Sequence, residues 1–240
     1  SPEEAAAGMT VHGEASIVSY WIQQGTDELT MKARLPAAQL MVERQIRLHG
    51  QEVLFSEEVE NLSVLDRPVA WTQHVTLGPP FLERGVTQFR VPAAKSMTIG
   101  GEVFTWPMLN GESLQTYTSK PQSGGFSTHL LDPHRKQVFF LSYSPKSKLL
   151  FGYVWNREDF PWLGMWDENN SRMSAPWNGR TLTRGLEFGA SPIPESRHKM
   201  IERGSLFGVP GYRWIPARTK VRVEYMAFAM EQDEIFEDLP

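Results

Sequence analysis

The sequence has no cysteine among its 240 residues, which excludes disulfide bonds and thiolate chemistry. It has no apolar run close to the roughly 20 residues that a membrane-spanning helix requires. It also has no excess of basic residues. The net charge is −4, and a chain without a basic field does not attract nucleic acid or an anionic membrane. We therefore expect neither nucleic acid nor a membrane as a partner, and the oligomeric state stays open.

The start of the chain lacks an initiator methionine, and residues 1–8 lack the basic flank and apolar stretch of a secretory signal. We therefore expect a processed form or part of a longer protein. The composition, with 40% hydrophobic and 22% charged residues, is that of an ordinary globular protein with a sizeable core. No internal repeat, low-complexity tract or linker divides the sequence, so we expect residues 1–240 to form one domain.

Strand and turn signals are abundant throughout the sequence. Runs rich in β-branched and aromatic residues alternate with turns drawn from 19 glycines and 17 prolines. Many short strands at this spacing are typical of a β-sandwich or barrel rather than of alternating β and α units. The expected strands cover residues 15–23, 28–35, 40–48, 53–62, 69–77, 87–91, 96–99, 126–131, 137–143, 149–155, 181–188 and 219–230.

One helix is expected, over residues 194–203. It opens with Pro194, carries basic side chains towards its end and stops at Gly204, because glycine readily adopts the positive φ of a helix terminus. His49-Gly50-Gln51 marks a tight hairpin between two expected strands. These signals predict an all-β fold with one short helix near the C-terminus.

Glu187 is the most unusual charged residue, because it stands among apolar and glycine neighbours in Arg184-Gly-Leu-Glu-Phe-Gly189. A carboxylate in such a strand costs free energy unless it is paired, hydrogen-bonded or neutralised. Arg184 is an odd number of positions away, so in a regular strand it points to the opposite face and is not an automatic partner. Glu187 is therefore either half of a structural pair or a working base.

Two histidines could complete a site with Glu187. His12 precedes the first expected strand, and His74 lies within a strand, in Trp71-Thr-Gln-His-Val75. These residues and Glu14 are metal-ligand types, but no His-x-His or His-Glu-x-x-His spacing supports a metal site. The remaining histidines are expected to be solvent-exposed structural residues: His49, His129, His134 and His198.

Three tryptophans lie in a segment that resembles a loop, rich in proline, glycine and asparagine. Exposed indole rings beside polar side chains suit sugar recognition, because the ring packs on C–H faces and polar groups take the hydroxyls. The alternative is that these rings close one end of the sandwich. The three residues are Trp162, Trp166 and Trp177.

Several catalytic motifs are absent from the sequence. No Gly-x-Ser-x-Gly elbow supports a serine nucleophile, and no glycine-rich phosphate-binding motif is present. The acidic residues after Met230 are expected to form a solvated tail.

The order and context of several segments resembles the galactose mutarotase-like superfamily, which includes the aldose 1-epimerases. An early His12-Gly13 precedes an edge strand, and Arg44 leads to Glu58-Val-Glu-Asn-Leu-Ser63. His74 follows in a later strand. Glu187 is the only glutamate of the expected strand at residues 181–188, towards the end of the chain. The resemblance implies a large antiparallel β-sandwich with a sugar site on its concave face.

The resemblance also implies mutarotation, the interconversion of sugar anomers, on a small-molecule sugar or sugar derivative. Glu187 would be the base for the O1 hydroxyl and His74 the acid for the ring oxygen, so the two should face each other across one sugar-sized pocket. His12 would hold the substrate, and no metal or organic cofactor is needed. Further candidates for sugar binding are Arg44, Asp167, Trp166 and Arg180.

Two features depart from the family pattern. Familiar aldose epimerases have His-Pro-Tyr-Phe-Asn-Leu where this chain has His74-Val-Thr-Leu-Gly-Pro79. They are also longer, usually with extra strands before the first histidine. The chain therefore looks like a divergent branch of the family or a chain without those first strands.

Other functions are open on the same kind of fold. A glycoside hydrolase needs two carboxylates, which Glu187 with Asp167 or Glu168 could supply. A polysaccharide lyase would use a tyrosine or histidine base beside a neutralising group, and a non-catalytic carbohydrate-binding module would use the three tryptophans. The additional candidates for a lyase are Tyr143, Tyr153 and Asn178.

Overall fold

The computed structural model describes Ala5, Ala6, Thr10 and residues 12–239. Their contacts form two compact units. The first contains the chain up to Trp71 and Pro194–Met226, and the second contains Thr72–Ile193 and the chain from Ala227 onward. That residues 1–240 form one domain stays a prediction. No helix in the described part of the chain is long and apolar enough to cross a membrane.

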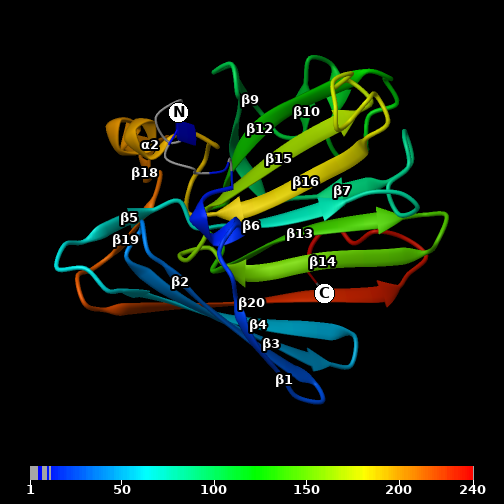
Figure 1. Ribbon diagram of the computed structural model, residues 1–240. Coiled ribbons are helices and arrows are strands. Elements are labelled where there is room, and N and C mark those ends of the chain that lie inside the picture. Colours follow the sequence, from blue (N-terminus) through cyan, green and yellow to red (C-terminus); the bar gives the residue numbers. More distant parts are fainter. Residues whose placement is uncertain (1–4, 7–9, 11, 240) are drawn as a thin grey trace. The chain divides into compact units, whose positions relative to one another are not determined.

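The first unit consists mainly of antiparallel strands. One sheet has the order β1-β2-β3-β4 followed by the beginning of β20, and β5 pairs with β19 (Figure 1). Its elements are η1, a 3₁₀ turn (Glu14–Ser16), β1 (Trp21–Gln24), β2 (Glu28–Leu35), β3 (Leu40–His49), β4 (Glu52–Asn61), β5 (Arg67–Val69), α2 (Arg197–Arg203), β17 (Ser205–Leu206), β18 (Val209–Pro210), β19 (Arg213–Ile215) and the start of β20 (Lys220–Glu231).

The second unit contains a six-stranded antiparallel sheet with the order β6-β16-β15-β12-β8-β9, and Figure 1 shows its central strands side by side. A second group of strands has the order β14-β13-β7, with the end of β20 beside β14. The elements are β6 (Thr72–Leu77), β7 (Gln88–Arg90), β8 (Ala93–Thr98), β9 (Val103–Phe104), β10 (Met108–Leu109), β11 (Glu112–Ser113), β12 (Ser123–Leu131), β13 (Gln137–Ser144), β14 (Leu149–Asn156), β15 (Trp162–Asn169) and β16 (Leu182–Gly189).

The core of the second unit lies between one face of the six-stranded sheet and β14. Phe188 of β16 stacks on Trp155 of β14 with ring centroids 4.2 Å apart, and Leu163 and Leu186 are fully buried on the same face. Successive residues of a strand point to opposite faces. The face that carries Glu187 is therefore the one turned away from this core, whereas Leu186 and Phe188 point into it.

The all-β prediction and most of the expected strands are confirmed, including the β3–β4 hairpin. The helix begins at Arg197 rather than at residue 194, because Ser196 is its N-cap and accepts a hydrogen bond from the backbone N–H of Lys199. It ends as predicted at Gly204, with φ of 67°.

Two expected strands are interrupted. Residues 15–23 were expected to be one strand, but β1 starts only at Trp21, because Glu14 accepts hydrogen bonds from the backbone N–H groups of Ala37 and Ala38 and so fixes the preceding 3₁₀ turn. Residues 69–77 divide into β5 and β6 at Trp71, whose buried indole donates a 2.8 Å hydrogen bond to Glu57.

The interpretation of residues 162–169 as a loop is wrong, since they form β15. This strand pairs along its whole length with β12 on one side and β16 on the other. Trp162 is fully buried there, whereas Trp166 is half-buried. The strand has no β-branched residue, so local propensity favours a loop, and only pairing with two neighbours makes it a strand.

The expectation that His129 is exposed is also wrong, because its side chain is fully buried in β12. Its ring nitrogens lie 2.8 Å from the Ser96 hydroxyl and 3.0 Å from the Ser127 hydroxyl, and Phe104 and Trp106 pack edge-on against it. Burial lowers the pKa of His129 to about 3, because a charged ring would lose its hydration there.

We expect His129 to make the fold sensitive to acid. The imidazole of the unfolded chain takes up a proton as the pH falls through about 6.5, whereas the folded ring stays neutral until its pKa of about 3. The unfolded chain then binds more protons, so the free energy of unfolding falls as the pH decreases, by about 1.4 kcal/mol per pH unit.

Urea denaturation at pH 7 and pH 4.5, on wild type and His129→Gln, measures this effect. The carboxylates contribute equally to both proteins, so the variant, although less stable at pH 7, should lose less stability on acidification. Equal losses in the two proteins would contradict the prediction.

Candidate functional site

His74 and Glu187 meet on adjacent strands of the six-stranded sheet. They are direct cross-strand partners in the register of β6 and β16, and the imidazole Nε2 lies 3.0 Å from the carboxylate Oε1. The other ring nitrogen, Nδ1, lies 3.1 Å from the hydroxyl of Thr76. The hydrogen bond to Glu187 raises the pKa of His74 above its ordinary value of 6.5, against an opposing effect of partial burial. The predicted acid and base therefore form one contact pair rather than standing apart.

Two glycines beside this pair let neighbouring side chains pack closely over the sheet. A Cβ atom at Gly185 would lie 3.2 Å from Oε1 of Glu187 and 3.4 Å from the ring of Trp166, and one at Gly164 would come within 2.8 Å of the ring of Phe126. Isolated glycines inside a strand often mark such close approaches. This signal was present in the sequence and could have pointed to the aromatic side chains around Glu187.

Trp166 shares the sheet face of Glu187, because its cross-strand partner in β16 is Gly185. Beyond it, the guanidinium of Arg172 lies 5.1 Å from the ring centroid of Trp166 and 4.9 Å from that of Trp177. Such distances are typical of cation–π contacts. No sequence pattern marks Arg172, since its position depends on the path of the segment between β15 and β16.

Glu168 holds the beginning of that segment. Its buried carboxylate accepts hydrogen bonds from the backbone N–H groups of Ser171 and Arg172 and from the Ser171 hydroxyl. It also lies 3.2 Å from Nε of Arg172. The carboxylate of Glu168 is thus committed to this local structure.

Asp167 lies on the opposite face of the sheet from Glu187. It is the cross-strand partner of Arg184, and the two form a bidentate ion pair with both distances 2.7 Å. Arg184 is almost completely buried, donates to the carbonyl oxygen of Leu114, and packs on the ring of Phe89. This explains why Arg184 is no partner of Glu187, as the strand alternation predicted.

The other predicted site residues lie elsewhere. His12, in a turn before η1, and Arg44, in β3, belong to the first unit, where Arg44 pairs with the buried Glu57. Arg180 belongs to the second unit and is exposed between β15 and β16. The structure thus brings together His74, Glu187 and Trp166, and a sugar-binding role for Asp167, His12, Arg44 and Arg180 stays a prediction.

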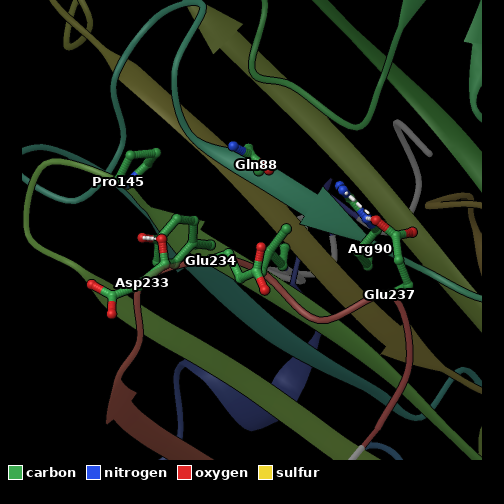
Figure 2. Close-up of a pocket in the computed structure, with 8 residues that line it drawn as sticks. Gln88, Arg90, Pro145, Asp233, Glu234 and Glu237 are labelled. Atoms are coloured by element: carbon green, nitrogen blue, oxygen red, sulfur yellow. Dashed lines mark hydrogen bonds and ion pairs between the residues drawn. The ribbon is translucent and has the colours of Figure 1, made fainter.

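A pocket of about 360 Å³ lies in another part of the second unit, between β7, β13 and the segment after β20 (Figure 2). Two ion pairs involve residues that line it: Arg90 with Glu237 at 2.7 Å, and Asp233 with Lys148 at 2.7 Å. The Tyr143 hydroxyl donates to the carbonyl oxygen of Asp233. These contacts fix the acidic segment after β20, which was expected to be a solvated tail. We therefore assign no binding function to this pocket.

A metal site finds no support in the described residues, where no three histidine or carboxylate side chains gather closely enough to bind an ion. Glu14, one of the possible ligands, instead caps the backbone at Ala37 and Ala38.

The antiparallel sheets define an all-β protein with the galactose mutarotase-like fold, as comparison with solved structures shows. A protein from Escherichia coli whose name assigns it provisionally to the aldose 1-epimerases has a TM-score of 0.68 and 9% identity, covering 92% of this chain and 71% of its own. A galactose mutarotase-like protein from Lactobacillus casei has a TM-score of 0.64 and 14% identity, covering 92% of this chain and 76% of its own.

A second protein with the same provisional name, from Klebsiella pneumoniae, has a TM-score of 0.63 and 10% identity. The match covers 90% of this chain but only 54% of that protein, so the chain spans about half its length. No protein-family model matches the sequence, and no curated protein sequence matches it. The likeness therefore establishes the fold and not the activity.

Proposed function

We propose that the protein interconverts the anomers of a sugar, with Glu187 as base and His74 as acid. The observation that carries this proposal is the direct contact of these two side chains on the face of the six-stranded sheet turned away from the core. The fold supports it, since solved proteins of this fold carry mutarotase names.

The contact geometry suits ring opening of a pyranose. The hydroxyl oxygen O1 and the ring oxygen are both bonded to C1, so a base and an acid in mutual contact can address both atoms. Glu187 takes the proton of O1, the C1–ring-oxygen bond breaks as O1 becomes a carbonyl, and His74 gives a proton to the ring oxygen. After rotation about C1–C2, the reverse transfers close the ring on the other face and restore both side chains.

Rival activities have less support among the described side chains. The second carboxylate of a hydrolase would be Asp167 or Glu168, but the first is paired with Arg184 on the opposite face and the second is buried in its local hydrogen bonds. Of the lyase candidates, Tyr143 donates to backbone oxygens next to the C-terminal segment and Tyr153 packs against Phe188 in the core. Neither lies with Glu187.

Anomer exchange tests the proposal directly. Fresh α-anomers of a panel of hexoses and pentoses, with neutral and anionic members, are followed by polarimetry and by saturation-transfer NMR with and without the protein. Acceleration above the buffer rate for at least one sugar supports a mutarotase. Binding without acceleration favours a carbohydrate-binding module, and shortening of an oligosaccharide favours a hydrolase or lyase.

The rate should depend on the protonation of His74. Its pKa is raised by Glu187, so the ring keeps its proton to a higher pH than a free histidine at about 6.5. The His74–Glu187 pair contributes its full stabilisation below about pH 6.5. This stabilisation is lost as the pH rises through the raised pKa of His74 in the folded protein. We expect the enzymatic rate to fall over the same range, because the acid is then absent.

NMR titration of the histidine C2–H signals, assigned with His74→Asn, measures this pKa. It should lie above 6.5 in wild type and move towards 6.5 in Glu187→Gln, and the alkaline fall in rate should follow it. A wild-type value at or below 6.5 would rule out the pairing.

A further inference from the structure

The Arg172 side chain lies among aromatic rings next to Trp166, which shares the sheet face of Glu187. Its guanidinium packs between two indole rings, those of Trp166 and Trp177, while its Nε atom lies 3.2 Å from the buried carboxylate of Glu168. The backbone N–H of Arg172 also donates to Glu168. The guanidinium is thus held in one orientation although the side chain is 44% exposed.

The outer edge of this guanidinium is open. Within residues 12–239, no hydrogen bond is found from its two Nη nitrogens, and the shortest guanidinium–carboxylate distance is the 3.2 Å between Nε and Glu168. A planar, oriented guanidinium with a free edge suits a carboxylate or a phosphate, which it can bind through two parallel hydrogen bonds.

The position of Arg172 relates it to the proposed catalytic pair. Trp166 lies over Gly185 beside the carboxylate of Glu187, and Arg172 packs on Trp166. The indole ring of Trp166 therefore neighbours both the guanidinium and the base. If C1 of a pyranose lies at His74 and Glu187, a sugar that extends over Trp166 brings its far end towards Arg172.

We propose that Arg172 selects sugars with an anionic group at the end remote from the anomeric carbon, a sugar acid or a sugar phosphate. This inference rests on the proposed function for the orientation of the sugar. Trp166 supplies the apolar surface for the sugar ring, and Glu168 positions the guanidinium.

Binding measurements test this independently of catalysis. Glucose, glucuronate and glucose 6-phosphate, with their galacto counterparts, are titrated by calorimetry or NMR into wild type, Arg172→Gln and Lys146→Gln. Lys146 is an exposed residue of the β13–β14 turn, and its variant loses the same charge. We expect wild type and Lys146→Gln to bind one anionic sugar at least tenfold more tightly than its neutral counterpart, and Arg172→Gln to lose this preference.

The anionic series identifies the source of the charge. Preference for glucuronate or galacturonate indicates a sugar acid, and preference for the 6-phosphates indicates a sugar phosphate. Arg172→Lys keeps the charge without the planar fork and should retain only part of the preference. Equal binding of neutral and anionic sugars by wild type, no binding of any anionic sugar, or an unchanged preference in Arg172→Gln would overturn the proposal.

Anomer exchange on the same sugars separates the two proposals. Fast anomer exchange of neutral sugars without a preference for anionic ones would support the mutarotase proposal and contradict the proposed role of Arg172. Arg172-dependent binding of an anionic sugar without exchange would retain the role of Arg172 and reject the mutarotase. If both hold, Arg172→Gln should lower kcat/KM about tenfold or more for the anionic sugar and change it less than about twofold for the neutral one.

Discussion

Glu187→Gln is expected to lower the enzymatic rate of anomer exchange by about 10²- to 10⁴-fold, the range that a positioned general base typically contributes. The amide keeps the size of the side chain and can still hydrogen-bond to His74, but it cannot take the proton of O1. Saturation-transfer NMR, with the buffer rate subtracted, measures the effect on whichever sugar of the panel wild type converts fastest.

The matched control is Glu102→Gln, the same change at an exposed position between β8 and β9. It should leave the rate within about twofold of wild type. Because the His74–Glu187 pair is partly exposed, Glu187→Gln should unfold at nearly the wild-type temperature, so lost activity does not reflect lost structure. A Glu187→Gln protein with wild-type exchange would exclude Glu187 as the base.

Asp167→Leu is expected to cost about 3–5 kcal/mol of unfolding free energy, the largest stability effect that we predict. The change leaves the guanidinium of Arg184 almost completely buried without its carboxylate. The carbonyl of Leu114 and the ring of Phe89 still contact the guanidinium, but neither carries a neutralising charge. Urea denaturation at pH 7 measures the loss.

Two further proteins make this test specific. The double variant Asp167→Leu/Arg184→Met removes both charges and should recover part of the loss, because no buried charge is left unpaired. Glu224→Leu removes one member of an exposed pair with Arg222 and should cost at most about 1 kcal/mol. Strict additivity in the double variant, or a loss below about 1 kcal/mol in Asp167→Leu, would show that the ion pair is not structural.

The Arg184–Asp167 ion pair and the proposed catalytic pair both involve β16, for a simple geometric reason. Arg184 and Glu187 lie three residues apart in β16, so they project to opposite faces, and each meets a charged partner on a different neighbouring strand. Arg184 pairs with Asp167 of β15, and Glu187 pairs with His74 of β6. Strand alternation alone predicted the separation, but not the two partners.

The sequence by itself determined the all-β class, the turns, the β3–β4 hairpin and the end of α2 at Gly204. These features depend on local patterns: alternation with period two and glycine at a positive φ. It also marked Glu187 and His74 as candidate site residues, because a carboxylate in an apolar strand and a histidine within a strand are unusual wherever they occur.

Tertiary structure alone decided which residues meet. Strand register placed His74 opposite Glu187, and pairing on both sides converted residues 162–169 from an expected loop into β15. Burial of His129 and the packing of Arg172 between two indoles likewise depend on neighbours distant in sequence. Local propensity does not predict such partners, since these contacts form only when separate strands are brought into register.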